Sequence, residues 1–535
     1  MIALLGGRPA RREYALLFAL ALTVGVLVAG GLSQPGYTDA YYYYNAAERL
    51  VAGLGLTDPY VALTYIGAPA DLPAPSHLYW MPLTSFVAAV GMWTTTSLRL
   101  GSALFDAAQG PFVLLWAALA LVGFWCGARL GGSRRHAWLA GLLIIASPFF
   151  APFWTTTDTF TLFGLCGVLA LISIGLGRAR RSLRWFALGG VMAGLAHLTR
   201  ADGMLLAIVL ALAALWPDGG SGWRARLRWA GVGLFAYTLV LTPWLLRNLA
   251  VGAPPLPAGG MATIWLRGYD EIVNYPPGEL TFTRFLDWGL ANIIASRWEA
   301  VTVNAQHFVA EQGLLVVWPF MFVGLWKRRR DPFLSGVWLY ALGLHGAMTF
   351  VFAYPGMRGG LFHSSSALLP FWFSLGVLGI DDAVGWVADR RRHWHAPQAR
   401  VFFSAALVIV MAALTVLMLT SRLPGWGSEW ERYAALGDLL PDDAVVMVNS
   451  PAAFYYHTRL PGVVVPNGGV ETVRMLCEQY GVTHVVLDVN RTQPLADLFL
   501  GRETAAFLTE IAHLGAGNAE MRVFEVAHPD GQDLP

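Results

Sequence analysis

Two aspartates, Asp39 and Asp158, stand beside long apolar runs, where a carboxylate can serve a reaction at a membrane boundary. Asp39 lies in the stretch Gly36-Tyr-Thr-Asp39-Ala-Tyr-Tyr-Tyr-Tyr44, and Asp158 follows Trp154-Thr-Thr-Thr. A carboxylate so placed can accept a proton, bind a sugar hydroxyl or hold a metal ion. The alternative is that each aspartate caps the helix that follows it, a role that does not exclude catalysis.

Three arginines, Arg200, Arg247 and Arg358, supply the opposite charge. We assign all three to the outer ends of membrane spans, against the usual bias of basic residues toward the cytoplasm. A guanidinium binds phosphate or pyrophosphate through paired, charge-assisted hydrogen bonds. The alternatives are snorkelling to the interface or pairing with a carboxylate, as Arg200 can pair with Asp202. Arg358, in a glycine-rich loop, is the strongest phosphate-binding candidate.

Histidines and aromatic residues complete the candidate site. His77, His307 and His363 are predicted on the same side of the membrane but lack a close metal-binding spacing, so ordinary hydrogen bonds are their default role. The residues that we expect to bind substrate are Tyr42, Tyr43, His77, Tyr79, Trp80 and His363. No cofactor follows from the sequence, apart from the hypothesis of a divalent metal ion held by Asp39 and Asp158.

The elements that must position these residues are transmembrane helices. Hydrophobic residues make up 56% of the 535 residues and charged residues 13%, against roughly a quarter charged in a soluble domain. The fold class is therefore an α-helical polytopic membrane protein with about 11 transmembrane helices. The apolar runs lie near 14–32, 107–126, 136–153, 159–177, 185–199, 203–216, 229–246, 313–326, 333–353, 366–380 and 401–420.

The positive-inside rule orients these spans with the N-terminus inside. The basic clusters at 129–135, 178–184, 224–228, 327–330 and 390–392 all become cytoplasmic if 82–93 stays outside as an interfacial or re-entrant helix. The runs on either side of Arg200 and Asp202 must then form a hairpin. The first run is predicted to be a signal-anchor; a cleaved signal peptide is the alternative.

This topology divides the chain into a membrane domain, 1–420, with outer loops 33–98 and 248–312, and a soluble extracytoplasmic α/β domain, 429–535. The latter has β-rich runs at 445–448, 463–465 and 484–487, and a helical pattern at 471–480 that Gly481 ends. The rings of residues 454–457 either stack on a sugar or dock this domain on the membrane domain. We expect deletion after Ser421 to spare hydrolysis of a lipid donor and to lower transfer.

Several function classes are excluded. The net charge is only +2 and the basic residues flank apolar runs, so nucleic acid is not a predicted partner. Cys126, Cys166 and Cys477 form neither a disulfide framework nor a CxxC metal site. No Walker loop, nucleophile elbow or dinucleotide fingerprint is present, which leaves soluble nucleotide-driven chemistry unsupported.

The order of these motifs resembles that of the C-type membrane glycosyltransferases, close in pattern to protein O-mannosyltransferases and lipid A aminoarabinose transferases. The similar stretches are Asp39 with its tyrosines, His77-Leu-Tyr-Trp-Met-Pro-Leu83, Asp158, Leu198-Thr-Arg-Ala-Asp-Gly203 and Pro243-Trp-Leu-Leu-Arg-Asn248 with Gly252-Ala-Pro254. They cover about residues 1–420. The chain departs from the family at Asp39-Ala40, where Asp-Glu is common, and at Trp80-Met-Pro-Leu83, where a Lys-Pro-Pro-Leu-like stretch is common.

The resemblance implies a hexosyl- or pentosyltransferase that moves a sugar from a polyprenyl-phosphate donor to an extracytoplasmic lipid, glycan or protein. It also implies that Asp39 is the essential acidic residue, and that the enzyme lies among the lipids of the cell (inner or plasma) membrane. Two alternatives remain: a transporter or flippase of lipid-linked sugars, and an inactive scaffold. The spans at 107–126, 159–177 and 401–420 carry no charge at mid-membrane, which favours the enzyme over a transporter.

Overall fold

The computed structural model describes residues 7–527, apart from residues 70, 99–102, 218, 392 and 428. The predicted cytoplasmic Arg392 and the last eight positions of the predicted C-terminal domain lie outside the described residues. The chain divides into two compact units. The first comprises Met1–Ser33, Met81–Arg247 and Arg297–Pro424; the second comprises Gln34–Trp80, Asn248–Ser296 and Gly425–Pro535.

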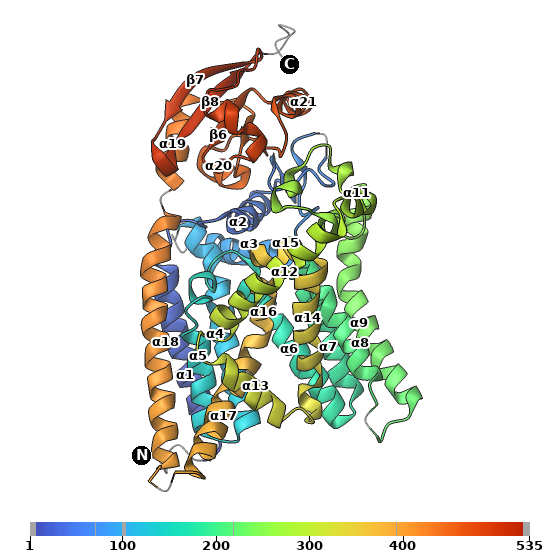
Figure 1. Cartoon of the computed structure of the whole chain (residues 1–535), viewed down its shortest axis with the longest axis vertical. Helices are drawn as coiled ribbons and strands as arrows, with labels where there is room; N and C mark the ends of the chain where they lie inside the picture. Colours follow the sequence, from blue (N-terminus) through green and yellow to red (C-terminus); the bar gives the residue numbers. More distant parts are fainter. Residues whose placement is uncertain are drawn as a thin grey trace. The chain divides into compact units, whose positions relative to one another are not determined.

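The first unit is a bundle of helices that form where the apolar runs predict them. Each predicted run contains a helix, because a continuous apolar stretch without charge satisfies its backbone internally and buries its side chains. Pro111 and Pro243 lie inside two of these helices, α4 and α9. The helices of this unit include α1 (Arg11–Ala29), α3 (Leu83–Ser97), α4 (Leu104–Gly131), α5 (Arg134–Ile145), α6 (Thr159–Arg180), α7 (Leu183–Thr199), α8 (Met204–Leu215), α13 (Trp318–Lys327), α14 (Ser335–Gly346), α16 (Leu361–Ser365) and α17 (Leu369–Ala388). Several of them lie side by side in Figure 1. Three further helices have residues assigned to both units: α9 (Trp223–Ala250), α12 (Leu290–His307) and α18 (Ala396–Trp426).

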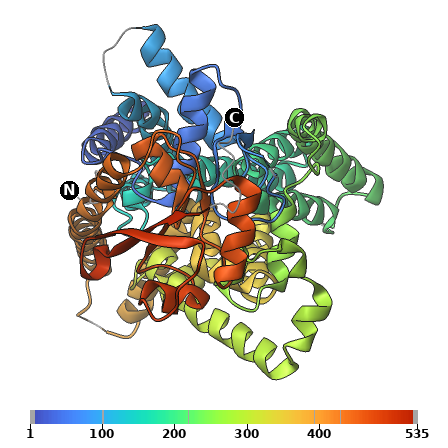
Figure 2. The same ribbon diagram turned by 90° about the horizontal axis from the view of Figure 1, so that it is seen from above.

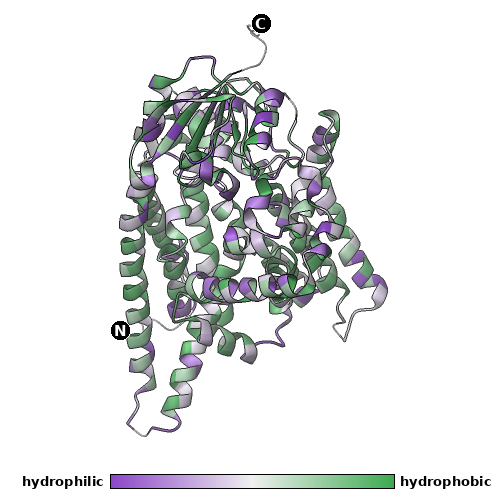
Figure 3. Ribbon diagram, turned by 45° about the horizontal axis from the view of Figure 1, so that its top comes forward, coloured by the Kyte–Doolittle hydropathy of each residue, from purple (hydrophilic) through white to green (hydrophobic). Residues whose placement is uncertain are grey.

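Seven helical segments among the described residues are long and apolar enough to cross a membrane. They are Arg11–Ala29, Leu104–Gly131, Thr159–Arg180, Trp223–Ala250, Pro332–Val351, Ala353–Ala388 and Ala396–Trp426. Their apolar colouring is continuous over much of α18 and its neighbours in Figure 3. The chain is therefore a multi-pass membrane protein. The remaining predicted runs form shorter helices, so the count of about 11 spans and the inward N-terminus stay predictions.

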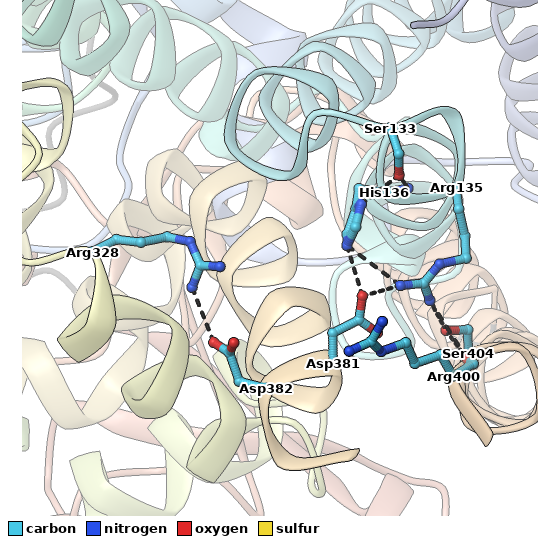
Figure 4. Close-up of polar contacts among 8 residues, drawn as sticks. All are labelled: Ser133, Arg135, His136, Arg328, Asp381, Asp382, Arg400 and Ser404. Atoms are coloured by element: carbon cyan, nitrogen blue, oxygen red, sulfur yellow. Dashed lines mark hydrogen bonds and ion pairs between the residues drawn. The ribbon is translucent and has the colours of Figure 1, made fainter. Parts of the chain in front are cut away.

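Ion pairs tie several helices of the first unit together at basic clusters that the sequence predicts to be cytoplasmic (Figure 4). Asp381 of α17 accepts from Arg135, and from His136 at 2.9 Å, both at the start of α5. Arg135 also donates to Ser404 Oγ of α18 at 2.6 Å. The next residue of α17, Asp382, pairs at 3.2 Å with Arg328, which follows α13. Two adjacent aspartates thus link α17 to α5 and to the end of α13, and Arg135 in turn links α5 to α18.

Removing the Asp381 carboxylate is expected to destabilise the protein. The Asp381→Ala variant leaves Arg135 and His136 without their anion in a site where the three side chains are only 12–14% exposed. Breaking such a buried pair costs about 3 kcal/mol. Thermal unfolding in detergent should show a clear drop in Tm, whereas Asp389→Ala, at the exposed residue directly after α17, should leave it unchanged. Equal Tm values for the two variants would contradict this account.

The second unit is built on a six-stranded sheet of order β2-β5-β4-β6-β8-β7. Five strands come from the C-terminal segment: β4 (Val446–Val448), β5 (Gly462–Val464), β6 (His484–Asp488), β7 (Leu508–Leu514) and β8 (Met521–Val526). β4 is parallel to β5 and β6, while β8 is antiparallel to β6 and β7; the longer strands are drawn in red in Figure 2. The predicted β-rich runs and the helix ending before Gly481, α21 (Val470–Tyr480), are confirmed.

The sixth strand of this sheet comes from the first predicted outer loop. β2 (Tyr60–Val61) pairs in parallel with β5, Tyr60 opposite Gly462. A separate two-stranded ladder joins β1 (Thr57–Asp58) to β3 (Ala74–Pro75). Residues 34–80 and 248–296 of the two predicted outer loops therefore fold with the C-terminal segment as one unit, whereas 81–98 and 297–312 belong to the first unit. The sequence does not reveal this division.

Both faces of the sheet are covered. One face packs with α21 and with Tyr65, Ile272 and Val273, so that both outer loops contribute to its core. On the other face lie α2 (Thr38–Val51), α19 (Glu429–Leu439) and α20 (Pro451–Thr458). This burial of aromatic and branched side chains on two faces supplies the hydrophobic stabilisation of the unit.

The aromatic residues of α20 hold α2 in place. Phe454 is fully buried, and Tyr456 packs on Tyr41 with ring centroids 5.1 Å apart. The Tyr41 hydroxyl lies 3.3 Å from Nε2 of His457. These rings thus serve the interior of the second unit, where α2 carries the predicted catalytic Asp39. Because Phe454 is fully buried, its ring cannot stack on a sugar.

The His457 contact predicts a loss of stability in acid. Burial, with a smaller effect from Arg459, lowers the pKa of His457 from 6.5 to about 4. Between these values the unfolded chain takes up a proton that the folded chain does not, so stability falls as pH falls from 6.5 toward 4. Because the side chain is partly exposed, screening limits the effect to about 1 kcal/mol. The drop in Tm over this range should be smaller in His457→Gln; an equal drop would contradict the assignment.

Candidate functional site

In the first unit, two of the candidate site residues, Asp158 and His363, lie close together. Asp158 is fully buried, and its Oδ2 lies 3.8 Å from Nδ1 of His363. Nδ1 of His363 also lies 2.9 Å from the hydroxyl of Thr159, and its ring stacks on Phe160 at 3.8 Å. Asp158 is the N-cap of α6 and accepts from the Thr159 backbone N–H, so the capping alternative is confirmed. The cap fixes the carboxylate in place beside His363.

Arg200 joins the same cluster. Its Nη1 lies 3.5 Å from the Thr159 hydroxyl, and its Nε lies 3.2 Å from Oδ1 of Asp202. The pairing with Asp202 is therefore confirmed as well. Asp202 accepts from the hydroxyl of Ser364, the residue after His363. A guanidinium has five N–H donors, so the contact with Asp202 uses only part of its capacity and is compatible with anion binding.

The break between α7 and α8 positions Arg200. Arg200 leaves α7 in an extended conformation, and a 3₁₀ turn at Ala201–Gly203 leads into α8. A Cβ on Gly203 would lie 2.5 Å from the backbone nitrogen of His197, so only glycine permits this approach. The two short helices that the sequence predicts as a hairpin thus pack against each other, and the turn that joins them carries Arg200.

Arg358 lies five positions before His363, in an irregular turn. The π-helical segment Gly356–Gly360 is interrupted at Arg358 and at Gly359, whose φ of 120° favours glycine. Such π-turns occur often at functional sites. Arg247 lies in the last turn of α9, with its guanidinium 4.7 Å from the centre of the Trp244 ring. His307, the remaining histidine, pairs with Glu311 at 2.6 Å.

In the second unit, Asp39 is the second residue of α2. The N-cap position belongs to Tyr37, so the alternative that Asp39 is the cap is wrong. A carboxylate in the first turn of a helix is still stabilised by the helix dipole. Tyr42 and Tyr43 follow Asp39 by three and four positions, which places them on the same side of the helix.

The predicted substrate-binding residues of this unit form one aromatic cluster. Tyr42 packs against His77 at 5.2 Å and against Trp80 at 4.4 Å, and Tyr79 packs against Trp80 at 5.5 Å. Tyr42, Tyr43 and His77 are at most 3% exposed, whereas Tyr79 and Trp80 are only partly buried. The exposed part of the cluster, and so the part that can touch a ligand, is its Tyr79 and Trp80 side.

Asp58, which contacts this cluster, was not predicted from the sequence as a site residue. The Tyr42 hydroxyl donates to Oδ2 of Asp58 at 2.9 Å, and the His77 backbone N–H donates to the same hydroxyl at 2.7 Å. Burial, and then the Asp58 charge, raise the pKa of Tyr42 well above its usual value, so this phenol stays a donor. The only signal in the sequence is an acidic residue in a proline-rich loop, which is too weak to identify a site.

A divalent metal ion is compatible with these residues. Asp158 and His363 offer a carboxylate oxygen and an imidazole nitrogen, ligand types that bind zinc and similar cations. They lie within 4 Å of each other, at the distance of two ligands of one ion. The contact of the Thr159 hydroxyl with Nδ1 of His363 holds the imidazole ring with this nitrogen near the Asp158 carboxylate.

No protein-family model matches the sequence, and no curated protein matches it at a significant level. Solved structures, in contrast, share its fold. The oligosaccharyltransferase of Archaeoglobus fulgidus, solved in complex with Zn and sulfate, matches over 90% of this chain and 69% of its own, with 14% identity and a TM-score of 0.55. ArnT from Cupriavidus metallidurans, bound to undecaprenyl phosphate, matches over 97% of this chain and 100% of its own, with 15% identity and a TM-score of 0.54.

The arabinofuranosyltransferase AftD from Mycobacteria matches over 98% of this chain and 42% of its own, with 17% identity and a TM-score of 0.51. All three are C-type membrane glycosyltransferases. The predicted resemblance to that fold is therefore confirmed. At such low identity the likeness concerns the fold, and function must be argued from the residues of the site.

Proposed function

We propose that the protein is an inverting glycosyltransferase that moves a sugar from a polyprenyl-phosphate donor to an extracytoplasmic acceptor. One observation carries the proposal: a cluster of the buried Asp158 with the partly buried His363 and Arg200, in a fold shared with glycosyltransferases. The neighbour ArnT was solved with undecaprenyl phosphate, which supports a polyprenyl-phosphate donor here. The protein would reside in the inner or plasma membrane with its C-terminal segment outside.

The reaction is one displacement at the anomeric carbon. The acceptor hydroxyl loses its proton to Asp39 while its oxygen bonds to the anomeric carbon, and the bond from that carbon to the phosphate oxygen breaks. Arg358, Arg247 and Arg200 are the proposed phosphate ligands, since charge grows on the departing phosphate as this bond lengthens. Phosphate is already a good leaving group, so positioning and charge stabilisation account for most of the rate gain.

His363 and Asp158 have a separate proposed role. Asp158 fixes the first turn of α6, and the His363 ring contacts the Thr159 hydroxyl in that turn. The same hydroxyl accepts from Arg200, so the two residues help to position its guanidinium. If a divalent ion is bound, Asp158 and His363 are its proposed ligands in the first unit, and it would supply positive charge near the phosphate. That Asp39 also binds this ion remains a hypothesis from the sequence, where Asp39 follows the first apolar run.

The experiment that tests this function follows the sugar in reconstituted vesicles. Polyprenyl-phosphate sugar of known anomeric configuration is supplied with a membrane extract as the source of acceptor. Lipid phosphate and glycosylated product should appear in equal amounts, with the anomeric configuration inverted by NMR. Retained configuration would contradict the single displacement. Transmembrane flux of the donor without any product would instead support the transporter.

A further inference from the structure

A recess within the second unit has Asp58 among its lining residues. Its volume is about 60 Å³. Its side-chain walls include Tyr42, Asp58, Tyr60, Thr64, Tyr79 and Trp80. All of these residues belong to Gln34–Trp80, the first outer segment of the second unit. The recess therefore combines one acidic group with aromatic rings and a hydroxyl.

A larger pocket of about 240 Å³ adjoins this recess. The two share the walls formed by Gly67, Pro69, Pro75 and Leu78, and the larger pocket is closed by Asn248 and the turn 251–254. One water molecule takes up about 30 Å³ in the liquid, so the pocket has room for a ligand of the size of a sugar ring. Its apolar walls suit the C–H face of such a ring.

The chemistry of the recess suits the hydroxyl edge of the same ligand. Asp58 is 8% exposed and lies on β1, where Arg49 fixes the neighbouring Thr57 with a hydrogen bond of 2.9 Å to its carbonyl. Tyr42 donates to Oδ2 of this carboxylate, and a carboxylate can accept about four hydrogen bonds in all. A buried carboxylate is stabilised by each further donor that reaches it, and sugar hydroxyls are such donors.

We propose that this recess and pocket bind one neutral sugar ring of the acceptor. Asp58 accepts hydrogen bonds from its hydroxyls, and Trp80 and Tyr79 pack on its apolar face. The assignment of this sugar to the acceptor rests on the proposed function, whereas the binding of a sugar ring rests on the pocket alone. It assigns a carbohydrate, and not an unglycosylated peptide or lipid, as the acceptor class.

The test is direct binding to the full-length protein in lipid nanodiscs, with methyl hexopyranosides and methyl pentofuranosides as probes. Saturation-transfer NMR should detect at least one of these glycosides. In Asp58→Asn its Kd should rise at least tenfold, because the amide accepts fewer hydrogen bonds and lacks the charge. An asparagine oxygen still accepts from Tyr42, so the fold should persist, which Tm will show. The exposed Asp71→Asn is the control and should bind like the unmodified protein.

A pair of adjacent glycines offers a second test with no change of charge. In α10 (Ala258–Ala262), a Cβ on Gly259 would lie 2.1 Å from the Tyr79 ring, whereas a Cβ on Gly260 meets nothing within 4 Å. Gly259→Ala must displace Tyr79 and should raise the Kd for the glycoside several-fold. Gly260→Ala should leave it unchanged. Equal Kd values for these two variants would count against Tyr79 as a wall of the site.

The remaining outcomes separate this proposal from the proposed function. Binding is measured without turnover, so bound glycoside in a protein that shows no transfer counts against the proposed function alone. If none of the glycosides binds, or if Asp58→Asn binds as tightly as the unmodified protein, the sugar site is wrong. If a polyprenyl-phosphate sugar displaces the glycoside competitively, the pocket holds the donor sugar and the acceptor assignment is overturned.

Discussion

Replacing Asp39 by asparagine is expected to lower the rate of sugar transfer by about 10² to 10⁴-fold, the contribution typical of a general base. Asparagine keeps the size of the side chain but cannot take the proton of the acceptor hydroxyl. The position lies in the first turn of α2, where the loss of the charge costs the helix only about 0.5 kcal/mol, so folding should persist. Transfer is measured in vesicles as glycosylated product per protein.

The matched control for Asp39 is Asp71→Asn, which removes an exposed carboxylate from the same outer segment. It should transfer at the normal rate. A near-normal rate in Asp39→Asn would show that another group takes the proton, and the proposed mechanism would be wrong.

Deletion of the chain after Ser421 is expected to abolish both transfer and hydrolysis of the lipid donor. The sequence alone predicts that hydrolysis survives; the structure changes that expectation. α2, which carries Asp39, packs on α20, and its neighbour β2 pairs with β5. Without the C-terminal segment, Tyr41, Tyr42 and Tyr60 lose most of the core in which they are buried. Each buried aromatic side chain contributes about 2 kcal/mol, so α2 should lose its fixed position.

Donor hydrolysis is measured as free polyprenyl phosphate, and insertion of the shortened chain is checked by protease protection. A chain ending at Ala527 retains all strands of the sheet and is the control. If the chain ending at Ser421 inserts normally and still hydrolyses donor at the full rate, then the position of Asp39 does not depend on α20.

The transmembrane helices could be predicted because each depends on a continuous apolar run. Their lengths were less predictable. In the run 136–153 the helix α5 ends at Ile145, because Pro148 disfavours a helical conformation at Ser147. The Ser147 hydroxyl, which accepts from Trp154 Nε1 at 2.9 Å, stabilises the turn that follows. Hydropathy does not register such a break.

The candidate site could be predicted in its residue types but not in its partners. Asp158 and Arg200 are conspicuous as charges beside apolar runs, and their neighbour His363 lies 204 positions after Thr159 in the sequence. Nothing local specifies that contact. The two-residue strand Tyr60–Val61 is likewise too short to show a periodicity, yet it joins a sheet some 400 positions away.

Asp58 illustrates the same limit. Its proposed role depends on its contact with Tyr42, 16 positions earlier, and on Tyr79 and Trp80, which line the same recess. The sequence shows only an acid next to a proline. Conversely, the tyrosines after Asp39 are so numerous that pattern alone cannot separate Tyr42, which supports the recess from within the core, from a ring that faces a ligand.

The central claim is that the chain breaks the bond between a sugar and a polyprenyl phosphate. The purified protein in nanodiscs is incubated with a panel of polyprenyl-phosphate hexoses and pentoses, and free lipid phosphate is quantified by mass spectrometry. The account predicts time-dependent release from at least one donor, with a much lower rate in Asp39→Asn and in Arg358→Ala. Release from none of them by a folded protein, or release at equal rates in all three proteins, would contradict it.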